Sequence, residues 1–133
     1  MIAKLTTKAH KLSNIVAVPA WRNALRRHRV AAGAEHLSVL RQFAGCRIVV
    51  DIGANRGQFA LVARYSFPAA RMVSFEPLAG PAAVFRRVFG SDDAVTLHET
   101  ALGPHAARST MHISARDDSS SLVKCTAADL CNV

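Results

Sequence analysis

Two acidic residues at the ends of short apolar segments, Asp51 and Glu76, are the side chains whose type and position indicate ligand binding. Asp51 lies near the end of the apolar segment 48–52, and a turn bounded by two glycines, Gly53 to Gly57, follows directly. Glycine allows a sharp backbone turn and a close approach by a ligand. Open α/β sheets bind ligands at the carboxyl ends of their strands. We therefore expect a ligand site where this strand meets its turn.

The spacing of these residues indicates a nucleotide-type cofactor. Glu76 lies 23 residues after Gly53. In nucleotide-binding units, roughly 20 residues separate the glycine turn from the acid that binds the ribose. A carboxylate serves there because it accepts hydrogen bonds from two neighbouring hydroxyls. Glu76 is therefore the predicted ribose acid.

The turn itself disfavours a dinucleotide. Its sequence is Gly-Ala-Asn-Arg-Gly, not the Gly-x-Gly-x-x-Gly that brings a pyrophosphate onto a helix N-terminus. Asp51 would also repel a phosphate. An acidic strand end suits a cationic part of a cofactor, such as an α-amino or sulfonium group. The pattern thus favours S-adenosylmethionine over NAD, and a dinucleotide-dependent oxidoreductase is the least favoured interpretation.

The elements that must position these residues alternate along the chain. Apolar periodicity and turn residues predict strands over 48–52, 71–75 and 94–98, with helices over 58–65 and 79–89. Such alternation is typical of an α/β protein with a parallel sheet, whose right-handed crossovers stack the second and third strands outward from the first. Alternation over 110–114 predicts an antiparallel strand or hairpin. The apolar residues expected to face the core are Phe59, Phe75, Ala83, Val84, Phe85, Val88 and Phe89.

Length and composition narrow the class of protein. The 133 residues suffice for one domain with a single core, and half of them are hydrophobic while a fifth are charged, as in globular proteins. No apolar run approaches the roughly 18 residues of a membrane span, so no transmembrane segment is expected. Three cysteines are an odd and sparse set, which favours reduced thiols in a cytoplasmic protein.

The positive charge is concentrated before the predicted sheet. Seven of the 17 basic residues and none of the nine acidic ones fall within residues 1–34, so this segment carries +7 of the net charge of +8. Its apolar residues follow helical spacing over 1–16, and a second helix is predicted over 20–43, interrupted near Gly33. We therefore divide the chain into a basic helical N-terminal arm, 1–44, and a partial cofactor-binding domain, 45–133.

Three interpretations of the arm remain open. Its bases could contact the phosphates of nucleic acid or of an anionic membrane surface. It could instead be an organelle transit peptide, which is also basic and poor in acids. The third interpretation, which we favour, is a pair of helices that packs on the domain and leaves a solvated basic face.

Taken together, three motifs resemble the FkbM family of S-adenosylmethionine-dependent methyltransferases. They are VVDIGANRGQFA over 49–60, VSFEP over 73–77 and HETALG over 98–103, followed by serines and a leucine. The resemblance extends over about residues 48–123, with the motifs in order and at matching spacing. It implies a Rossmann-like class I methyltransferase sheet and O-methylation of a sugar or secondary-metabolite hydroxyl, so the expected partner is a small-molecule or glycan acceptor.

The resemblance also assigns the cofactor site residue by residue, without identifying a catalytic base. The segment around the methionine part comprises Asp51, Gly53, Ala54, Asn55 and Gly57. Glu76 matches the ribose acid, and Pro77 turns the chain away from it. The residues that match the segment near the adenine are Thr100, Ala101 and Leu102.

One departure from the family pattern bears on activity. Members continue into a fourth strand with a Lys/Asp/Glu-Gly motif, and this chain reaches Val133 without one. We therefore expect an incomplete sheet whose first strand has an open edge. Either the chain is a fragment of a methyltransferase, which is the interpretation we favour, or another polypeptide covers this edge. The chain alone is expected to bind S-adenosylmethionine weakly or not at all. The alternative function is a catalytically inactive binding module, in which residues 1–34 hold nucleic acid or an anionic membrane surface.

Histidines at 98, 105 and 112 recur every seven residues but lack the accompanying cysteines or acids of a metal site. We expect exposed side chains here and no bound metal.

Overall fold

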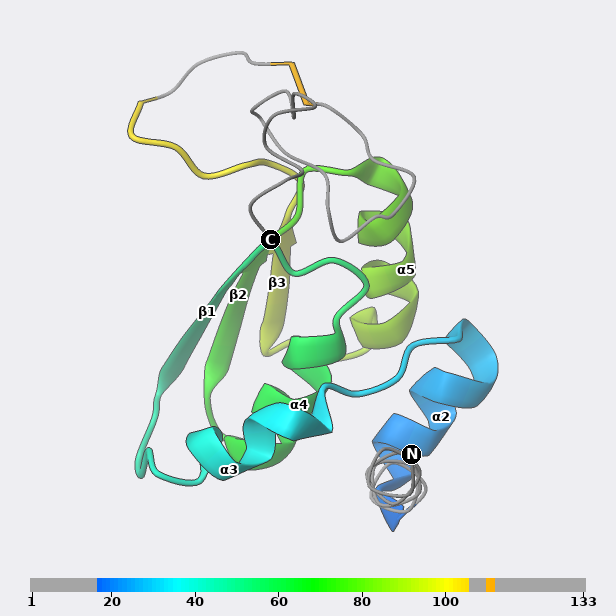
Figure 1. Cartoon of the computed structure of the whole chain (residues 1–133), viewed down its shortest axis with the longest axis vertical. Coiled ribbons are helices and arrows are strands. Elements are labelled where there is room, and N and C mark those ends of the chain that lie inside the picture. The colour runs from blue at the N-terminus through cyan, green and yellow to red at the C-terminus, as the bar shows by residue number, and fades with distance from the viewer. Residues whose placement is uncertain (1–16, 106–109, 112–133) are drawn as a thin grey trace, which may run out of the picture. The chain divides into compact units, whose positions relative to one another are not determined.

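The computed structural model describes residues 17–105 and 110–111, and the chain divides into two compact units, Met1–Leu102 and Gly103–Val133. The described part of the first unit is an α/β structure (Figure 1). Most of the strand or hairpin predicted over 110–114 lies outside the described residues. The strands are β1 (Ile48–Ile52), β2 (Arg71–Phe75) and β3 (Val95–His98), and the helices are α2 (Pro19–His28), η1 (Ala34–His36), α3 (Leu37–Leu40), α4 (Gln58–Ser66) and α5 (Ala79–Phe89).

The sheet has the order β1-β2-β3 and is parallel throughout, which confirms the predicted parallel α/β arrangement. Helix α4 connects β1 to β2 and α5 connects β2 to β3, as parallel strands require a crossover. β2 and α5 have the predicted bounds, and β3 begins one residue later than predicted. This topology is compatible with a fragment of a Rossmann-like fold.

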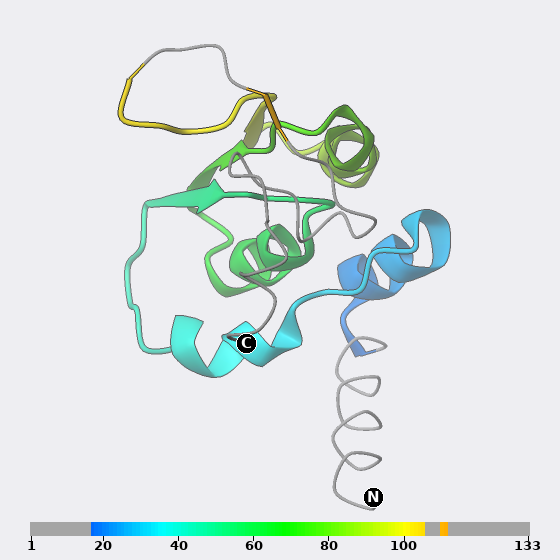
Figure 2. The same ribbon diagram turned by 45° about the horizontal axis from the view of Figure 1, so that its top comes forward.

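The two faces of the sheet differ in what covers them. Figure 2 shows α4 and α5 on the same side of the three strands. Asp51 pairs in register with Ser74, and both side chains are buried on this covered face. The neighbouring positions on β1 point the other way, because strand side chains alternate. The side chains of Ile48, Val50 and Ile52 are accordingly exposed on the open face.

Helix α2 is part of the hydrophobic core. Trp21 is only 1% exposed, and its indole Nε1–H donates a 3.0 Å hydrogen bond to the Leu61 carbonyl of α4. Its ring meets Tyr65 edge-to-face, with centroids 5.1 Å apart. Ala24, one turn further along α2, is also buried. Helix α2 therefore packs against the domain, as expected in the interpretation of the arm as a pair of packed helices.

The helix predicted over 20–43 with an interruption near Gly33 is present as separate pieces, α2 and then η1 and α3, and the interruption begins earlier than predicted. Helix α2 ends at His28, and Arg29 adopts a left-handed conformation with φ of 60°. The Val30 N–H then donates to the Ala24 carbonyl at 3.2 Å, and the Val30 side chain is 1% exposed. An apolar residue just after a left-handed cap commonly packs back on its helix. Burial of Val30 therefore ends the helix at His28, five residues before Gly33.

The core-facing side of α5 was predicted only in part. Phe85 and Phe89 are buried as expected, with ring centroids 4.7 Å apart. Ala83 is exposed, and the buried small residues are Pro81 and Ala82. One position along a helix rotates a side chain by about 100°. Ala82 therefore faces the core in place of the predicted Ala83, whereas Val84 and Val88 pack against the core as predicted.

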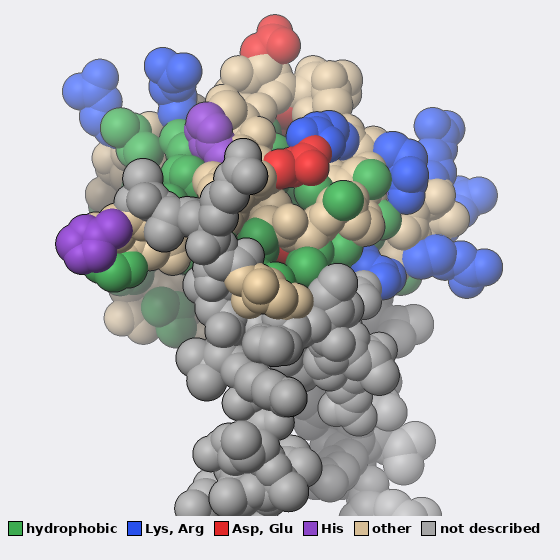
Figure 3. All heavy atoms as spheres, turned by 90° about the horizontal axis from the view of Figure 1, so that it is seen from above, with side chains coloured by type: hydrophobic (Ala, Val, Ile, Leu, Met, Phe, Trp, Pro, Cys, Tyr) green, Lys and Arg blue, Asp and Glu red, His purple; other side chains and the backbone are tan. Residues whose placement is uncertain are grey.

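The outer side of α2 is basic. Arg22, Arg26, Arg27 and Arg29 are exposed, and the segment 17–34 contains no acid. In Figure 3, basic side chains gather at the side of the molecule where Figure 1 places α2 and α5. Among the residues that the structure describes, no helix combines the length and apolarity needed to cross a bilayer.

Candidate functional site

The carboxyl ends of the three parallel strands bring the predicted site residues to one edge of the sheet. The register pairs Asp51 of β1 with Ser74 of β2. Glu76 follows directly after β2, and its N–H donates to the His98 carbonyl at the end of β3 at 3.0 Å. Asp51 and Glu76, 25 positions apart in the sequence, thus lie at the ends of neighbouring strands.

The turn after β1 folds over the end of β2. The N–H groups of Gly53 and Ala54 both donate to the Phe75 carbonyl, each at 2.9 Å. Gly53, Asn55 and Gly57 all have positive φ angles of 80°, 48° and 95°. Three left-handed residues within five produce the sharp reversal that leads from the strand into α4. Asn55 is the least costly non-glycine choice for such a position.

The two glycines of the turn have different surroundings. A Cβ atom built on Gly53 would meet nothing within 4 Å, so there is free space beside this residue. A Cβ on Gly57 would lie 2.6 Å from Cε2 of Phe89 and 3.2 Å from Cδ2 of Phe85. Gly53 therefore leaves room for a ligand, whereas Gly57 allows the close packing of α5 against the turn.

Glu76 fastens the turn to the start of α5. Its carboxylate is 5% exposed, and its two oxygens accept hydrogen bonds from different backbone groups. The Asn55 N–H donates to Oε2 at 2.8 Å, and the Leu78 N–H donates to Oε1 at 2.8 Å. Hydrogen bonds to a charged acceptor are stronger than neutral ones. Glu76 thus fixes the position of Asn55 over the end of β2.

Asp51 is a buried carboxyl group that lacks a full set of partners. The residue is 8% exposed, and no described residue forms a hydrogen bond with its Oδ2 atom. The pKa of Asp51 is raised to about 6, chiefly by burial and also by the nearby Glu76 carboxylate, while His36 acts to lower it. The hydroxyl of the paired Ser74 is also without a described partner. The end of β1 therefore presents a polar pair that a ligand with donors would satisfy.

The raised pKa of Asp51 predicts how stability depends on pH. The folded pKa of about 6 lies above the ordinary aspartate value of 3.8, so between these pH values the folded state binds more protons than the unfolded state. Stability contributed by this group is therefore highest below about pH 4 and falls as the pH rises to about 6. Asp51→Asn removes the ionisation, so its stability relative to wild type should rise by about 2 to 3 kcal/mol between pH 4 and 7.

Urea denaturation followed by circular dichroism at a series of pH values measures this difference. Asp93→Asn, at an exposed acid in a turn, is the matched control and should follow the wild type at every pH. A constant difference between Asp51→Asn and wild type across this range would contradict the raised pKa.

The other predicted site residues lie around this edge at the surface. Pro77, half-buried, lies between Glu76 and the N-cap residue of α5. Thr100 follows β3, its N–H donates to the His98 carbonyl at 2.9 Å, and its hydroxyl donates to the Ala101 carbonyl at 3.2 Å. Thr100, Ala101 and Leu102 are exposed. This segment is therefore near the end of β3 and accessible.

Two residues near Asp51 were not predicted from the sequence. Ser74 could have been found from strand pairing, since matching the predicted strands end to end places it opposite Asp51. His36 belongs to η1, in the segment predicted as part of the arm, and its ring meets Phe59 edge-to-face at 5.4 Å. The Gly33 N–H donates to the Gln58 carbonyl at 2.9 Å and holds η1 near the start of α4. No local pattern signals this contact.

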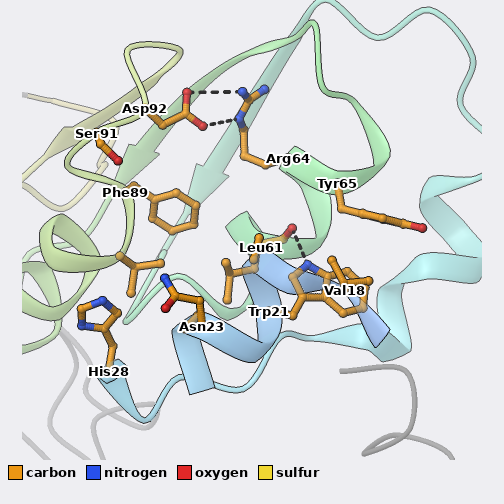
Figure 4. A pocket seen from close by; sticks show the side chains of 13 residues that line it. Val18, Trp21, Asn23, His28, Leu61, Arg64, Tyr65, Phe89, Ser91 and Asp92 are labelled. Carbon is orange, nitrogen blue, oxygen red and sulfur yellow. Dashed lines mark hydrogen bonds and ion pairs between the residues drawn. The ribbon is translucent and has the colours of Figure 1, made fainter. Parts of the chain in front are cut away.

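A cavity of about 340 Å³ lies between α2, α4 and α5, away from the strand ends (Figure 4). Trp21, Leu61 and Phe89 form its apolar wall. The Arg64 guanidinium on its border donates to Asp92 at 2.8 Å and to the carbonyls of residues 67, 68 and 70, so it serves to close the end of α4. The cavity therefore contains a structural ion pair and none of the predicted site residues.

The described residues contain no group of three His, Cys, Asp or Glu side chains that could hold a metal ion. No protein-family model matches the chain, and no curated protein matches it.

Proposed function

We propose that this chain carries the cofactor half of an S-adenosylmethionine-dependent methyltransferase that methylates a sugar or secondary-metabolite hydroxyl. The observation that carries the proposal is the pair of buried carboxyl groups, Asp51 and Glu76, on neighbouring parallel strands beside the open space at Gly53. Ligands of open α/β sheets bind at this edge. The motif resemblance to the FkbM methyltransferases supports the same assignment.

Glu76 retains capacity for a ribose after its structural hydrogen bonds are formed. A carboxylate has about four acceptor positions on its two oxygens. The N–H groups of Asn55 and Leu78 occupy one position on each oxygen. One position per oxygen is left, which matches two adjacent ribose hydroxyls. The structural role therefore positions this carboxylate without using up its acceptors.

Asp51 suits the cationic end of the same ligand. Its Oδ2 lacks a hydrogen-bond partner among the described residues, and burial opposes its ionisation. An α-ammonium group next to it would supply both a donor and a positive charge, and would lower the pKa of the carboxyl. A pyrophosphate would instead face two carboxylates. This charge arrangement distinguishes the proposed ligand from NAD.

Bound at this edge, S-adenosylmethionine would supply a methyl group on a positively charged sulfur, which an acceptor hydroxyl could take by direct displacement, with the thioether as leaving group and the hydroxyl proton passing to a base. The residues here contribute orientation of the donor, and proximity of this kind accounts for much of such catalysis. Thr100, Ala101 and Leu102 would border the adenine, at the end of the strand next to Glu76.

Titration calorimetry with S-adenosylmethionine and its demethylated product tests the assignment. We expect weak binding of both, with the affinity rising from pH 5 to pH 7 as Asp51 ionises. Asp51→Asn should weaken binding about tenfold at pH 7, because one charge-assisted contact is lost, and should abolish the pH dependence. Tighter binding of NAD, or an unchanged affinity in Asp51→Asn, would contradict the proposal.

The basic side of α2 favours a second candidate function, a binding module for an anionic partner. Four exposed arginines and no acid lie between residues 17 and 34. The apolar side of α2 is committed to the core through Trp21 and Ala24, so these arginines are presented outward. Binding to nucleic acid or anionic vesicles that weakens steeply with salt would support this function. Binding that does not depend on salt would exclude it.

A further inference from the structure

The outer edge of β1 is unpaired among the described residues. β1 bonds only to β2 in the sheet, with Arg71 N–H donating to the Arg47 carbonyl and Gly53 N–H donating to the Phe75 carbonyl, both at 2.9 Å. Peptide groups of successive residues in a strand point to opposite edges. The intervening residues Ile48, Val50 and Ile52 therefore direct their N–H and C=O groups away from β2.

The same three residues expose large apolar side chains. Ile48, Val50 and Ile52 are 63%, 55% and 66% exposed, on the face that α4 and α5 leave open. The register with β2 is continuous, so no bulge interrupts the edge, and the strand contains neither Lys nor Pro. Bulges, lysines and prolines are among the devices by which edge strands avoid pairing with another chain. β1 thus combines a free edge with an apolar surface.

The opposite edge of the sheet lacks this combination. β3 has four residues, and its side chains on the open face are the polar Thr96 and His98. The His98 ring is stacked on Phe75, with centroids 5.1 Å apart, and so covers part of the apolar surface there. Of the two edges of the described sheet, only that of β1 combines unpaired peptide groups with large exposed apolar side chains.

The sequence of β1 indicates which partner fits. The residues with outward peptide groups read Ile-Val-Ile, which is symmetric about Val50. In an antiparallel pair related by a two-fold axis at Val50, Ile48 lies opposite the partner's Ile52, and Val50 lies opposite its own copy. Opposed β-branched residues are favourable cross-strand pairs. An isologous interface requires this kind of self-complementarity.

Charge favours the same antiparallel arrangement. Arg47 and Arg71 lie at the amino ends of β1 and β2, whereas Asp51 and Glu76 lie at the carboxyl ends. Antiparallel pairing brings the basic end of one sheet beside the acidic end of the other. Parallel pairing would place like charges together.

We propose that β1 pairs with β1 of a second copy of this chain, in the register centred on Val50, to form a continuous six-stranded sheet. A five-residue strand is about 17 Å long. Pairing along one strand of this length buries an area at the small end of the range for specific interfaces. We therefore expect a reversible dimer. The inference does not use the methyltransferase proposal, although it concerns the same edge of β1 that the missing strands of that family leave open.

Sedimentation velocity of the full 133-residue chain over a hundredfold range of concentration tests the association. We expect a concentration-dependent shift from one to two chains per particle. Val50→Lys places a charge at the two-fold axis and should weaken dimerisation at least tenfold. Thr96→Lys is the matched control, because it adds the same charge to the same open face on β3, and it should dimerise as the wild type does. A monomer at every concentration, or larger oligomers without a dimer, would overturn the proposal.

Disulfide cross-linking tests the register without relying on those variants. In a background of Cys46→Ser, Cys125→Ser and Cys131→Ser, Val50→Cys should form a covalent dimer on mild oxidation. Opposed hydrogen-bonded residues have Cα atoms about 5.5 Å apart, within disulfide range. Thr96→Cys in the same background should remain monomeric. Mass spectrometry without a reducing agent measures both variants. Equal cross-linking of both variants, or none of Val50→Cys, would overturn the proposed register.

Discussion

Gly57→Ala is expected to lower the free energy of unfolding by about 2 to 5 kcal/mol. The φ angle of 95° is a left-handed conformation that costs a residue with a side chain about 1 to 2 kcal/mol. The new Cβ would also lie 2.6 Å from Cε2 of Phe89 and 3.2 Å from Cδ2 of Phe85, two buried rings. Overpacking of a core adds about 1 to 3 kcal/mol. Urea denaturation followed by circular dichroism measures the loss.

Gly53→Ala separates the two causes. This glycine has a similar φ of 80°, but a Cβ there would meet nothing within 4 Å. We therefore expect only the backbone cost, about 1 to 2 kcal/mol. Equal losses for Gly53→Ala and Gly57→Ala would show that contact with the two phenylalanines is not what requires glycine at position 57.

Glu76→Ala is expected to cost about 3 kcal/mol of stability and to abolish binding of S-adenosylmethionine. The substitution removes the acceptor of two 2.8 Å hydrogen bonds, from Asn55 N–H and Leu78 N–H. Each hydrogen bond to a charged group contributes about 1.5 to 3 kcal/mol, and losses that share one side chain do not add fully. The proposed ribose contacts disappear with the same carboxylate. Denaturation and calorimetry on one preparation measure both effects.

Two further variants serve as controls for the loss of stability in Glu76→Ala. Glu76→Gln keeps the shape but offers one oxygen, and its amide NH₂ would face a second donor, so an intermediate loss of stability is expected. Glu99→Ala removes an acid near the end of the next strand, whose partner is Arg86 at the surface. Exposed ion pairs contribute at most about 1 kcal/mol. If Glu76→Ala were no more destabilising than Glu99→Ala, Glu76 would not fasten the turn.

The sequence predicted those parts of the fold that depend on local pattern. β2 and α5 have their predicted bounds, because alternation and helical periodicity lie within each segment. It also placed Asp51 and Glu76 at strand ends, since Asp51 lies near the end of its apolar segment and Glu76 directly follows its own. The different surroundings of Gly53 and Gly57 were not predictable. They depend on Phe85 and Phe89, which lie about 30 residues further along the chain.

Contacts between distant segments account for the remaining differences. The end of α2 at His28 follows from burial of Val30, which depends on the core that α4 and α5 provide. The proximity of His36 to Asp51 likewise depends on how η1 packs at the start of α4. The structural use of Glu76 is a third case. An acid that could bind ribose and an acid that fastens a backbone turn have the same appearance in a sequence.

The indole of Trp21 has a consequence for how this protein can vary over evolution. It lies in the same hydrophobic cluster as Leu61 and Phe85, donates to a carbonyl of α4 and packs on Tyr65. A gene rearrangement that exchanged the segment before β1 would leave a large void unless the new segment supplied a comparable ring. The segment that contains α2 and the sheet therefore depend on each other for packing. We expect residues 21 and 65 to co-vary among related proteins.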